Sequence, residues 1–237
     1  MICRTKSEIR IMDNIMRQAN NAYPRISPYR VDSRLQTRKP DKHYIDWVNR
    51  LGRIVDTERI RSQWDSFLNI LLSSTKALKR NKLGDCAESS ALMMSALLAN
   101  GYKDGRIARL FFEAEARDLT TNEVVGTKLI DTTHELVVKN ASPEADSSNP
   151  KTYGKNMIII DAWDGFCSNM QEGFNRYYEL FLGGMRNWIN KDANVEITYK
   201  PQLRFLDFDK ISDSDVERFK IEFPELIRKK SQEETKL

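Results

Sequence analysis

The chain has 237 residues, of which 40% are hydrophobic and 30% are charged, a balance typical of a globular protein with one domain or one domain plus an extension. It has no uncharged apolar run long enough to span a membrane, and its charged N-terminus lacks the apolar segment of a secretory signal peptide. Three scattered cysteines exclude a disulfide framework, and the absence of CxxC and HxxxH pairs argues against a structural zinc site. We therefore expect a cytoplasmic protein, or one that a dedicated system delivers into a host cell.

The net charge of +4 is unevenly distributed. Residues 1–83 carry 18 basic and 8 acidic side chains, whereas residues 84–237 carry 20 and 26. This pattern is typical of two solvated surfaces of opposite sign, and it also fits a basic face for an acidic protein or an anionic membrane surface. We expect no nucleic-acid partner, because the basic residues are not interleaved with aromatic ones and no binding motif accompanies them.

Residues 1–80 are predicted to form a basic, helical N-terminal extension. Its first helix has Ser7 as a candidate N-cap, and a second helical segment precedes residue 80. Between them, residues 21–42 hold three prolines and predict a loop or an extended arm. The apolar residues at helical spacing are Ile9, Met12, Ile15 and Met16 in the first helix and Ile60, Trp64, Phe67, Leu68, Leu71 and Leu72 in the second.

The pattern changes after this extension. Residues 86–99 predict a helix that stops at Gly101. RIARLFFEAEA and EVVGTKLI flank a polar turn and predict a hairpin, THELVVKN and MIIIDAW predict two more strands, and VEITYK predicts a last one after helical or irregular material at 168–190. Residues 206–237 predict a short helix and a polar tail. The predicted class is α+β, with a core at 81–205 in which a helix packs on an antiparallel sheet.

Cys86 stands at the first turn of the predicted central helix. Asp85 can cap this helix, and Glu88 can reach back to it as in a capping box. The positive end of the helix dipole favours a nucleophilic thiolate, but the two carboxylates oppose it, so an imidazolium partner would be needed. Gly84 would let a substrate backbone approach closely, and the neighbouring N–H groups could hold an oxyanion.

The chain has two histidines. His43 lies in a charged segment at a helix start, which is typical of a surface or capping residue. His134 lies in TTHELVVKN, where alternation places it on one strand face with Leu136 and Val138. Such a histidine is commonly a satisfied core group, but here it shares a domain with Cys86.

MIIIDAWDG is a buried β-type run that ends in Asp161, and a carboxylate at that place needs a partner. The partner is either a backbone cap or His134 on the neighbouring strand, where the acid would fix the imidazole tautomer. Asp164 is the alternative acid. A cysteine at a helix start, a histidine on a strand and an aspartate at the end of the next strand are arranged in the order of a catalytic triad.

This pattern resembles the transglutaminase-like branch of the papain-like cysteine protease superfamily over residues 80–166. GDCAE is similar to the cysteine signature, HELVV to the histidine strand and IIIDAWDG to the aspartate strand. The resemblance implies a papain-like or transglutaminase-like core without a cofactor, in which Cys86 is the nucleophile, His134 the base and acid, and Asp161 the group that orients it.

Four further residues follow from the same reasoning as substrate-binding candidates: Asn81, Gly84, Asp85 and Trp163. The resemblance implies that Trp163 is a structural or site-lining aromatic, and that Asn81 supplies the amide that papain-like enzymes place before the cysteine. The sequence departs from the family at Ala162, where proline is common. The interval between His134 and Asp161 is also long, which the polar loop 141–156 accounts for as an insertion.

Three functions remain open at this stage. The first is a cysteine hydrolase that acts on a protein through an acyl-enzyme, as a peptidase or glutamine deamidase with transglutaminase as a third variant. The resemblance to toxins and injected effectors of bacterial pathogens suggests a host protein as substrate. The second is a non-catalytic interaction protein on a degenerate papain-like fold. The third is a metal hydrolase with Cys86, His134 and Asp161 as ligands.

Overall fold

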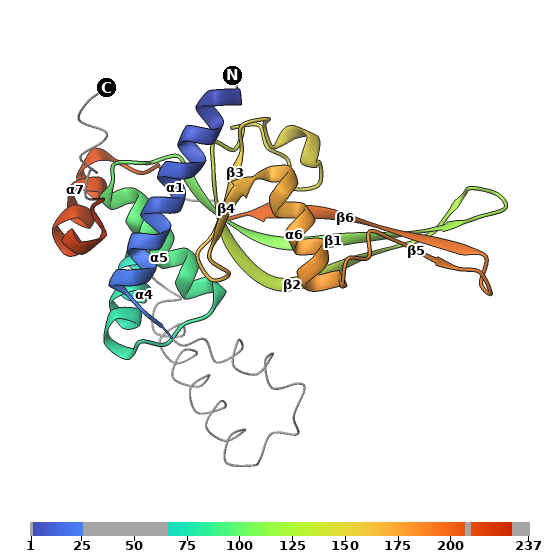
Figure 1. The fold of residues 1–237 in the computed structure, drawn as a ribbon, viewed down its shortest axis with the longest axis horizontal. Coiled ribbons are helices and arrows are strands. Elements are labelled where there is room, and N and C mark those ends of the chain that lie inside the picture. Colours follow the sequence, from blue (N-terminus) through green and yellow to red (C-terminus); the bar gives the residue numbers. More distant parts are fainter. Residues whose placement is uncertain (1, 26–65, 207–209, 229–237) are drawn as a thin grey trace, which may run out of the picture.

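The computed structural model describes residues 2–25, 66–206 and 210–228 (Figure 1). Within these ranges it has five α-helices and a six-stranded antiparallel sheet, so the predicted α+β class is confirmed. The helices are α1 (Ile2–Ala22), α4 (Phe67–Asn81), α5 (Cys86–Ala99), α6 (Met170–Leu182) and α7 (Asp213–Glu222). The strands are β1 (Gly105–Asp118), β2 (Val124–Lys139), β3 (Ile158–Asp161), β4 (Phe166–Asn169), β5 (Asn187–Asn190) and β6 (Val195–Phe205). Two short 3₁₀ helices lie at Pro150–Thr152 and Pro224–Leu226.

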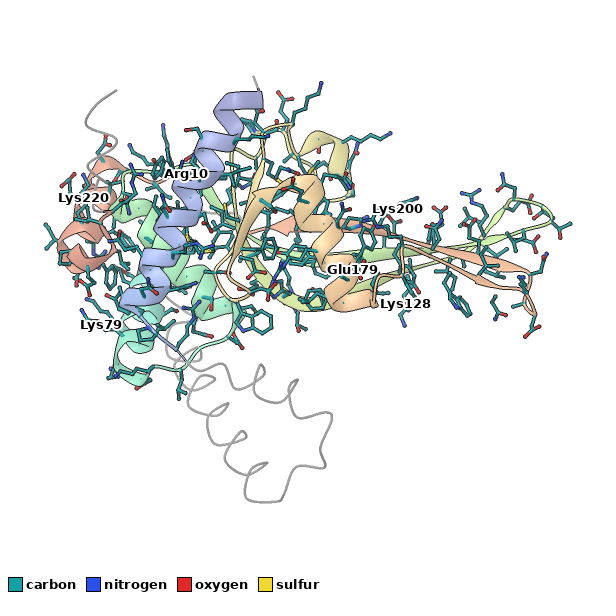
Figure 2. The ribbon with its side chains drawn as sticks, viewed as in Figure 1. Arg10, Lys79, Lys128, Glu179, Lys200 and Lys220 are labelled. Atoms are coloured by element: carbon teal, nitrogen blue, oxygen red, sulfur yellow. The ribbon has the colours of Figure 1, made fainter. Side chains whose placement is uncertain are left out.

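The strand order in the sheet is β4-β3-β2-β1-β6-β5. The long strands β1, β2 and β6, with β5 at the edge, run out beyond the helices as a narrow arm (Figure 1). Side chains project from both sides of this arm (Figure 2), and ion pairs such as Lys200 to Glu115 at 3.1 Å join its strands. β3 and β4 are much shorter, so the sheet is widest near the helices and narrows toward the arm.

Helices cover both faces of the wide end of the sheet. Alternation along β2 and β3 places Val137, Ile158 and Ile160 in a buried cluster with α1, α4, α5 and α7. The intervening residues Val138 and Ile159 lie in a second cluster with α6. α5 is buried along almost its whole length, because it lies between the sheet and the other helices. The described parts of the N-terminal region therefore pack into the same core as α5.

Several sequence predictions can be compared with these elements. The helix at 86–99, the β1–β2 hairpin, the strand at MIIID and the short C-terminal helix are confirmed. The capping box of Asp85 and Glu88 is also confirmed. The prediction of Ser7 as an N-cap is wrong, because α1 begins at Ile2 and Ser7 lies inside it. His43, Ile60, Trp64 and most of the loop at 21–42 lie outside the described residues.

Two further predictions need correction. EVVGTKLI and THELVVKN belong to one continuous strand, β2, rather than to two. The sequence predicts helical or irregular structure at 168–190, but this range contains α6 together with β5 and the end of β4. No helix in the described ranges combines the length and the apolar character that crossing a bilayer requires.

Candidate active site

The predicted site residues meet at the edge of β2, next to the place where β3 ends. β3 pairs with β2 only from Val137 to Lys139, and its last residue is Asp161. The first turn of α5 reaches this edge, where the Cys86 thiol donates a hydrogen bond to the Thr133 carbonyl at 3.5 Å. Three segments that are distant in sequence thus converge at one point of the sheet.

A kink in β2 brings the Thr133 carbonyl to the thiol. The backbone of Thr133 has a φ of 55° in the left-handed region, which is unusual for a β-branched residue. The Asp131 carboxylate holds it there by accepting the Thr133 N–H at 2.7 Å. Arg109 of β1 donates two bonds to the same carboxylate, at 3.0 and 2.7 Å. The strand therefore turns at this point without ending.

The cap of α5 sets the position of Cys86. The Asp85 carboxylate accepts the Ala87 N–H at 3.0 Å, and the Asp85 N–H donates to the Glu88 carboxylate at 3.0 Å. Both acidic side chains are buried, whereas Cys86 is half-buried. Among the described residues, no acceptor is bonded to the Cys86 N–H. This group, at the positive end of the helix, is therefore available to stabilise an oxyanion.

His134 and Asp161 form a buried pair. The His134 Nε2 lies 2.6 Å from Asp161 Oδ2, and the two side chains are 3% and 0% exposed. The backbone N–H groups of Trp163 and Asp164 donate to Asp161 Oδ1 at 3.1 and 2.9 Å. Because Nε2 is taken by the carboxylate, Nδ1 is the ring nitrogen left for the thiol of Cys86.

The electrostatics of this pair favour a charged imidazole. Burial by itself lowers the pKa of His134, but the charge and hydrogen bond of Asp161, together with a contribution from Cys86, raise this pKa to about 10. Burial likewise opposes the charge on Asp161, yet the imidazolium and the hydrogen bonds keep the pKa of Asp161 below its ordinary value. At neutral pH the pair is therefore an imidazolium and a carboxylate.

Aromatic rings surround the imidazole. The centroids of Trp163, Tyr177 and Phe181 lie 5.4, 5.6 and 5.3 Å from that of His134. Such a shell limits the access of water and strengthens the interactions inside it. Trp163 also lines the pocket that opens at Cys86.

A pocket of about 710 Å³ opens at the thiol. Its wall combines apolar residues of α4, the first turns of α5 and the kinked part of β2. The described lining residues include Phe67, Ile70, Leu71, Asp85, Cys86, Arg109, Thr133, His134, Glu135, Trp163 and Phe181.

Two of the predicted substrate-binding residues are not among the described lining residues. Asn81 ends α4, and its side-chain oxygen accepts a bond from Arg80 at 3.4 Å. Gly84 has a packing role, because a Cβ at this position would lie 2.8 Å from the Cβ of Glu88. The structure therefore brings together Cys86, Asp85, His134, Asp161 and Trp163, and leaves Asn81 and Gly84 outside the pocket.

The structure also adds residues that the sequence reasoning missed. Tyr177 of α6 donates to Asp161 Oδ2 at 3.1 Å, and Arg109 with Asp131 builds the kink. The helical spacing of Phe174, Tyr177, Tyr178 and Phe181 predicts a buried face of a helix. Nothing in that spacing indicates which strand end the face covers.

Asp164, the alternative acid, is bonded to Arg176 at 2.7 Å instead of to the imidazole. Cys167 is also removed from the site, since it donates to the Ile9 carbonyl at 3.6 Å and burial raises its pKa to about 12. Within the described ranges, no group of three or more His, Cys, Asp or Glu side chains is arranged to hold a metal ion. His134 and Asp161, two of the three ligands expected for a metal hydrolase, are bonded directly to each other.

Comparisons with family models, with curated proteins and with solved structures gave no match to this chain.

Proposed function

We propose that this protein is a cysteine-dependent hydrolase that acts on a protein substrate through Cys86, His134 and Asp161. The observation that carries the proposal is the buried bond between His134 and Asp161 beside a half-buried thiol at a helix N-terminus. An imidazole that is charged at neutral pH stabilises a neighbouring thiolate. The opposing effect of Asp85 and Glu88 is reduced, because each carboxylate is bonded to backbone N–H groups of the cap.

The proposed reaction has two steps. In the first, the Cys86 thiolate attacks a peptide or glutamine carboxamide carbon, and the Cys86 N–H bonds the resulting oxyanion. The His134 imidazolium gives its Nδ1 proton to the leaving nitrogen, the C–N bond breaks, and an amine or ammonia departs from a thioester. In the second, His134 takes a proton from water, the hydroxide adds to the thioester carbon, and the acid leaves as Cys86 is regenerated.

A transglutaminase-like core is the fold that we associate with this function. Two features support it: the cysteine opens a central helix that packs on an antiparallel sheet, and the histidine and aspartate lie on the adjacent strands β2 and β3. The apolar wall of the pocket favours an extended protein segment as the substrate. The choice between a peptidase and a deamidase depends on which carbonyl the pocket presents to the sulfur.

Alkylation of Cys86 tests the proposal directly. Wild type and His134→Ala are treated with iodoacetamide at pH 6, and peptide mass spectrometry reads Cys86 apart from the other two cysteines. An unassisted thiol is almost fully protonated at this pH, so we expect the rate to fall roughly 100-fold in His134→Ala. His43→Ala is the matched control and should retain the wild-type rate. Equal, slow labelling in wild type and His134→Ala would contradict the proposal and indicate a non-catalytic interaction protein.

The reaction type can then be read from a lysate treated with wild type or Cys86→Ala. New peptide termini that only the wild type produces identify a peptidase. Conversion of glutamine to glutamate identifies a deamidase, and glutamine–lysine isopeptides identify a transglutaminase.

A further inference from the structure

Four hydrogen bonds hold the Asp161 carboxylate, and they come from three parts of the chain. Oδ1 accepts the backbone N–H groups of Trp163 and Asp164, which lie in the turn after β3. Oδ2 accepts His134 Nε2 from β2 and the Tyr177 hydroxyl from α6, at 2.6 and 3.1 Å. The carboxylate oxygen that faces the imidazole is therefore shared with a phenol.

Tyr177 is fully buried in an apolar environment. Its ring packs against Phe166 and Phe181 at 5.5 and 6.1 Å and against the imidazole of His134 at 5.6 Å. Burial and the charge of Asp161 raise the pKa of Tyr177 well above its ordinary value. The phenol thus remains protonated at neutral pH and acts as a hydrogen-bond donor to Asp161.

We propose that Tyr177 is a positioning residue that fixes the Asp161 carboxylate and lowers the cost of removing the proton from His134. The hydroxyl has its largest effect when the imidazole is neutral. The imidazolium compensates the charge of Asp161, but once its proton has left, the carboxylate is a buried net charge. A hydrogen bond to an uncompensated charge is stronger than one to a charge that is already paired.

This effect bears on the acylation step, and its catalytic meaning rests on the proposed function. When the C–N bond of the substrate breaks, the Nδ1 proton of His134 moves to the leaving nitrogen. With a pKa of about 10, the His134 imidazolium is a weaker acid than an ordinary imidazolium. By stabilising the carboxylate that remains, the Tyr177 hydroxyl makes His134 a better proton donor than the pair with Asp161 alone would be.

Other charged groups also face the pair from the elements packed around it. Those that line the same pocket are Asp85, Cys86 and Glu88 of α5, Arg109 of β1 and Glu135 of β2, while Asp164 with Arg176 lies on the α6 side. These charged groups are retained in both Tyr177→Phe and Tyr178→Phe, so the comparison of the two variants isolates the contribution of the Tyr177 hydroxyl.

The test is the titration of His134, followed by NMR through its imidazole signals. The chain has two histidines, so the His43→Gln background leaves only the signals of His134. We expect Tyr177→Phe to raise the midpoint of the His134 titration by about 1 pH unit, because the neutral imidazole state loses a charge-assisted hydrogen bond. An unchanged or lowered midpoint in a folded Tyr177→Phe protein would overturn the proposal.

Tyr178→Phe is the matched control. Tyr178 is the next residue of α6, its ring packs against Phe112, and its hydroxyl donates to the Tyr199 carbonyl at 2.6 Å instead of to Asp161. Its loss should leave the His134 midpoint in place. A shift of equal size in both variants would show a general effect of loosening α6 and would also overturn the proposal.

A second variant covers the case in which Tyr177→Phe does not fold. Site-specific incorporation of 3-fluorotyrosine at position 177 keeps the hydroxyl and makes it a stronger donor, so the His134 midpoint should move downward, and an upward shift or none contradicts the role of Tyr177. These titrations need no substrate and are independent of Cys86 alkylation. If Tyr177→Phe shifts the His134 midpoint but His134→Ala leaves the rate of Cys86 alkylation unchanged, the role of Tyr177 in positioning Asp161 is supported and the hydrolase proposal is contradicted.

Discussion

A positive charge on His134 sits inside the folded chain at 3% exposure, and this makes the stability of the protein depend on pH. The pKa of His134 is raised from its ordinary 6.5 to about 10 on folding. The folded state therefore binds this proton more tightly than the unfolded state does. The resulting contribution to the free energy of unfolding is fully present below pH 6.5 and is lost as the pH rises to about 10.

We predict that wild type loses more stability than His134→Gln between pH 6.5 and 10, by on the order of 3–5 kcal/mol. Denaturant unfolding at several pH values measures the difference in slope. Because the lysines and tyrosines titrate in both proteins, their effects cancel, and His43→Gln should follow the wild type. Parallel slopes for wild type and His134→Gln would mean that the imidazole is neutral in the folded chain. The acid side has the opposite sign, since the lowered pKa of Asp161 gives a contribution that is lost as the pH falls through its folded value.

At the scale of elements, the first turn of α5 depends on the absence of a side chain just before it. A Cβ at Gly84 would lie 2.8 Å from the Cβ of Glu88 and 3.3 Å from a methyl group of Leu78. The Glu88 Cβ cannot move away easily, because its carboxylate is held by the capping box. Gly84→Ala should therefore push the start of α5 away from α4 and misplace Cys86.

We expect Gly84→Ala to destabilise the protein by about 1–3 kcal/mol, as overpacking typically does, and to slow the alkylation of Cys86. Gly126→Ala in β2 is the matched control, since the nearest atom to its new Cβ would be 4.0 Å away. Thermal unfolding of the two variants gives the comparison. Equal melting temperatures would show that Glu88 relaxes and that the turn does not need glycine.

The elements α5 and β2 show how much of the fold could be predicted from the sequence. α5 was predictable, because its cap at Asp85 and its stop at Gly101 are local signals, and Gly101 has the positive φ that such a stop uses. Asp131 and Thr132 separate the two strands that the sequence predicts in place of β2. In the fold, Asp131 bonds the Thr133 N–H, so the polar residues kink the strand without ending it.

The residues of the candidate site likewise fall into those with a local sequence signal and those without one. Cys86, His134 and Asp161 were recognisable because each has a local context: a helix start, an alternating strand and the end of a buried run. Tyr177 and Arg109 have no such context, since their importance depends on tertiary contacts across the sheet. Asn81 was selected for its closeness in sequence to Cys86, and a turn of the chain separates the two side chains.

At the scale of the whole molecule, the N-terminal helix is joined to the site. α1 packs in the same buried cluster as α5 through residues such as Met12 and Ile15. Just after α1, the Arg25 guanidinium donates to the Ala162 carbonyl at 2.7 Å and to the Ser89 hydroxyl at 2.8 Å. Asn20 donates to the same carbonyl at 3.1 Å. Because Ala162 directly follows Asp161, these bonds hold the turn that orients the carboxylate.

We predict that Arg25→Ala lowers the free energy of unfolding by about 1–3 kcal/mol, because two polar groups lose a charged donor in a half-buried position. It should also slow Cys86 alkylation several-fold, since a looser turn lets Asp161 and His134 depart from their aligned geometry. Arg17→Ala is the matched control, because Arg17 lies on α1 but its partner is the nearby Asp13 on the exposed surface. It should change neither quantity. If Arg25→Ala lost stability yet labelled Cys86 at the wild-type rate, α1 would support the core alone; a lower rate in Arg25→Ala but not in Arg17→Ala would place the N-terminal helix among the elements that set the geometry of the site.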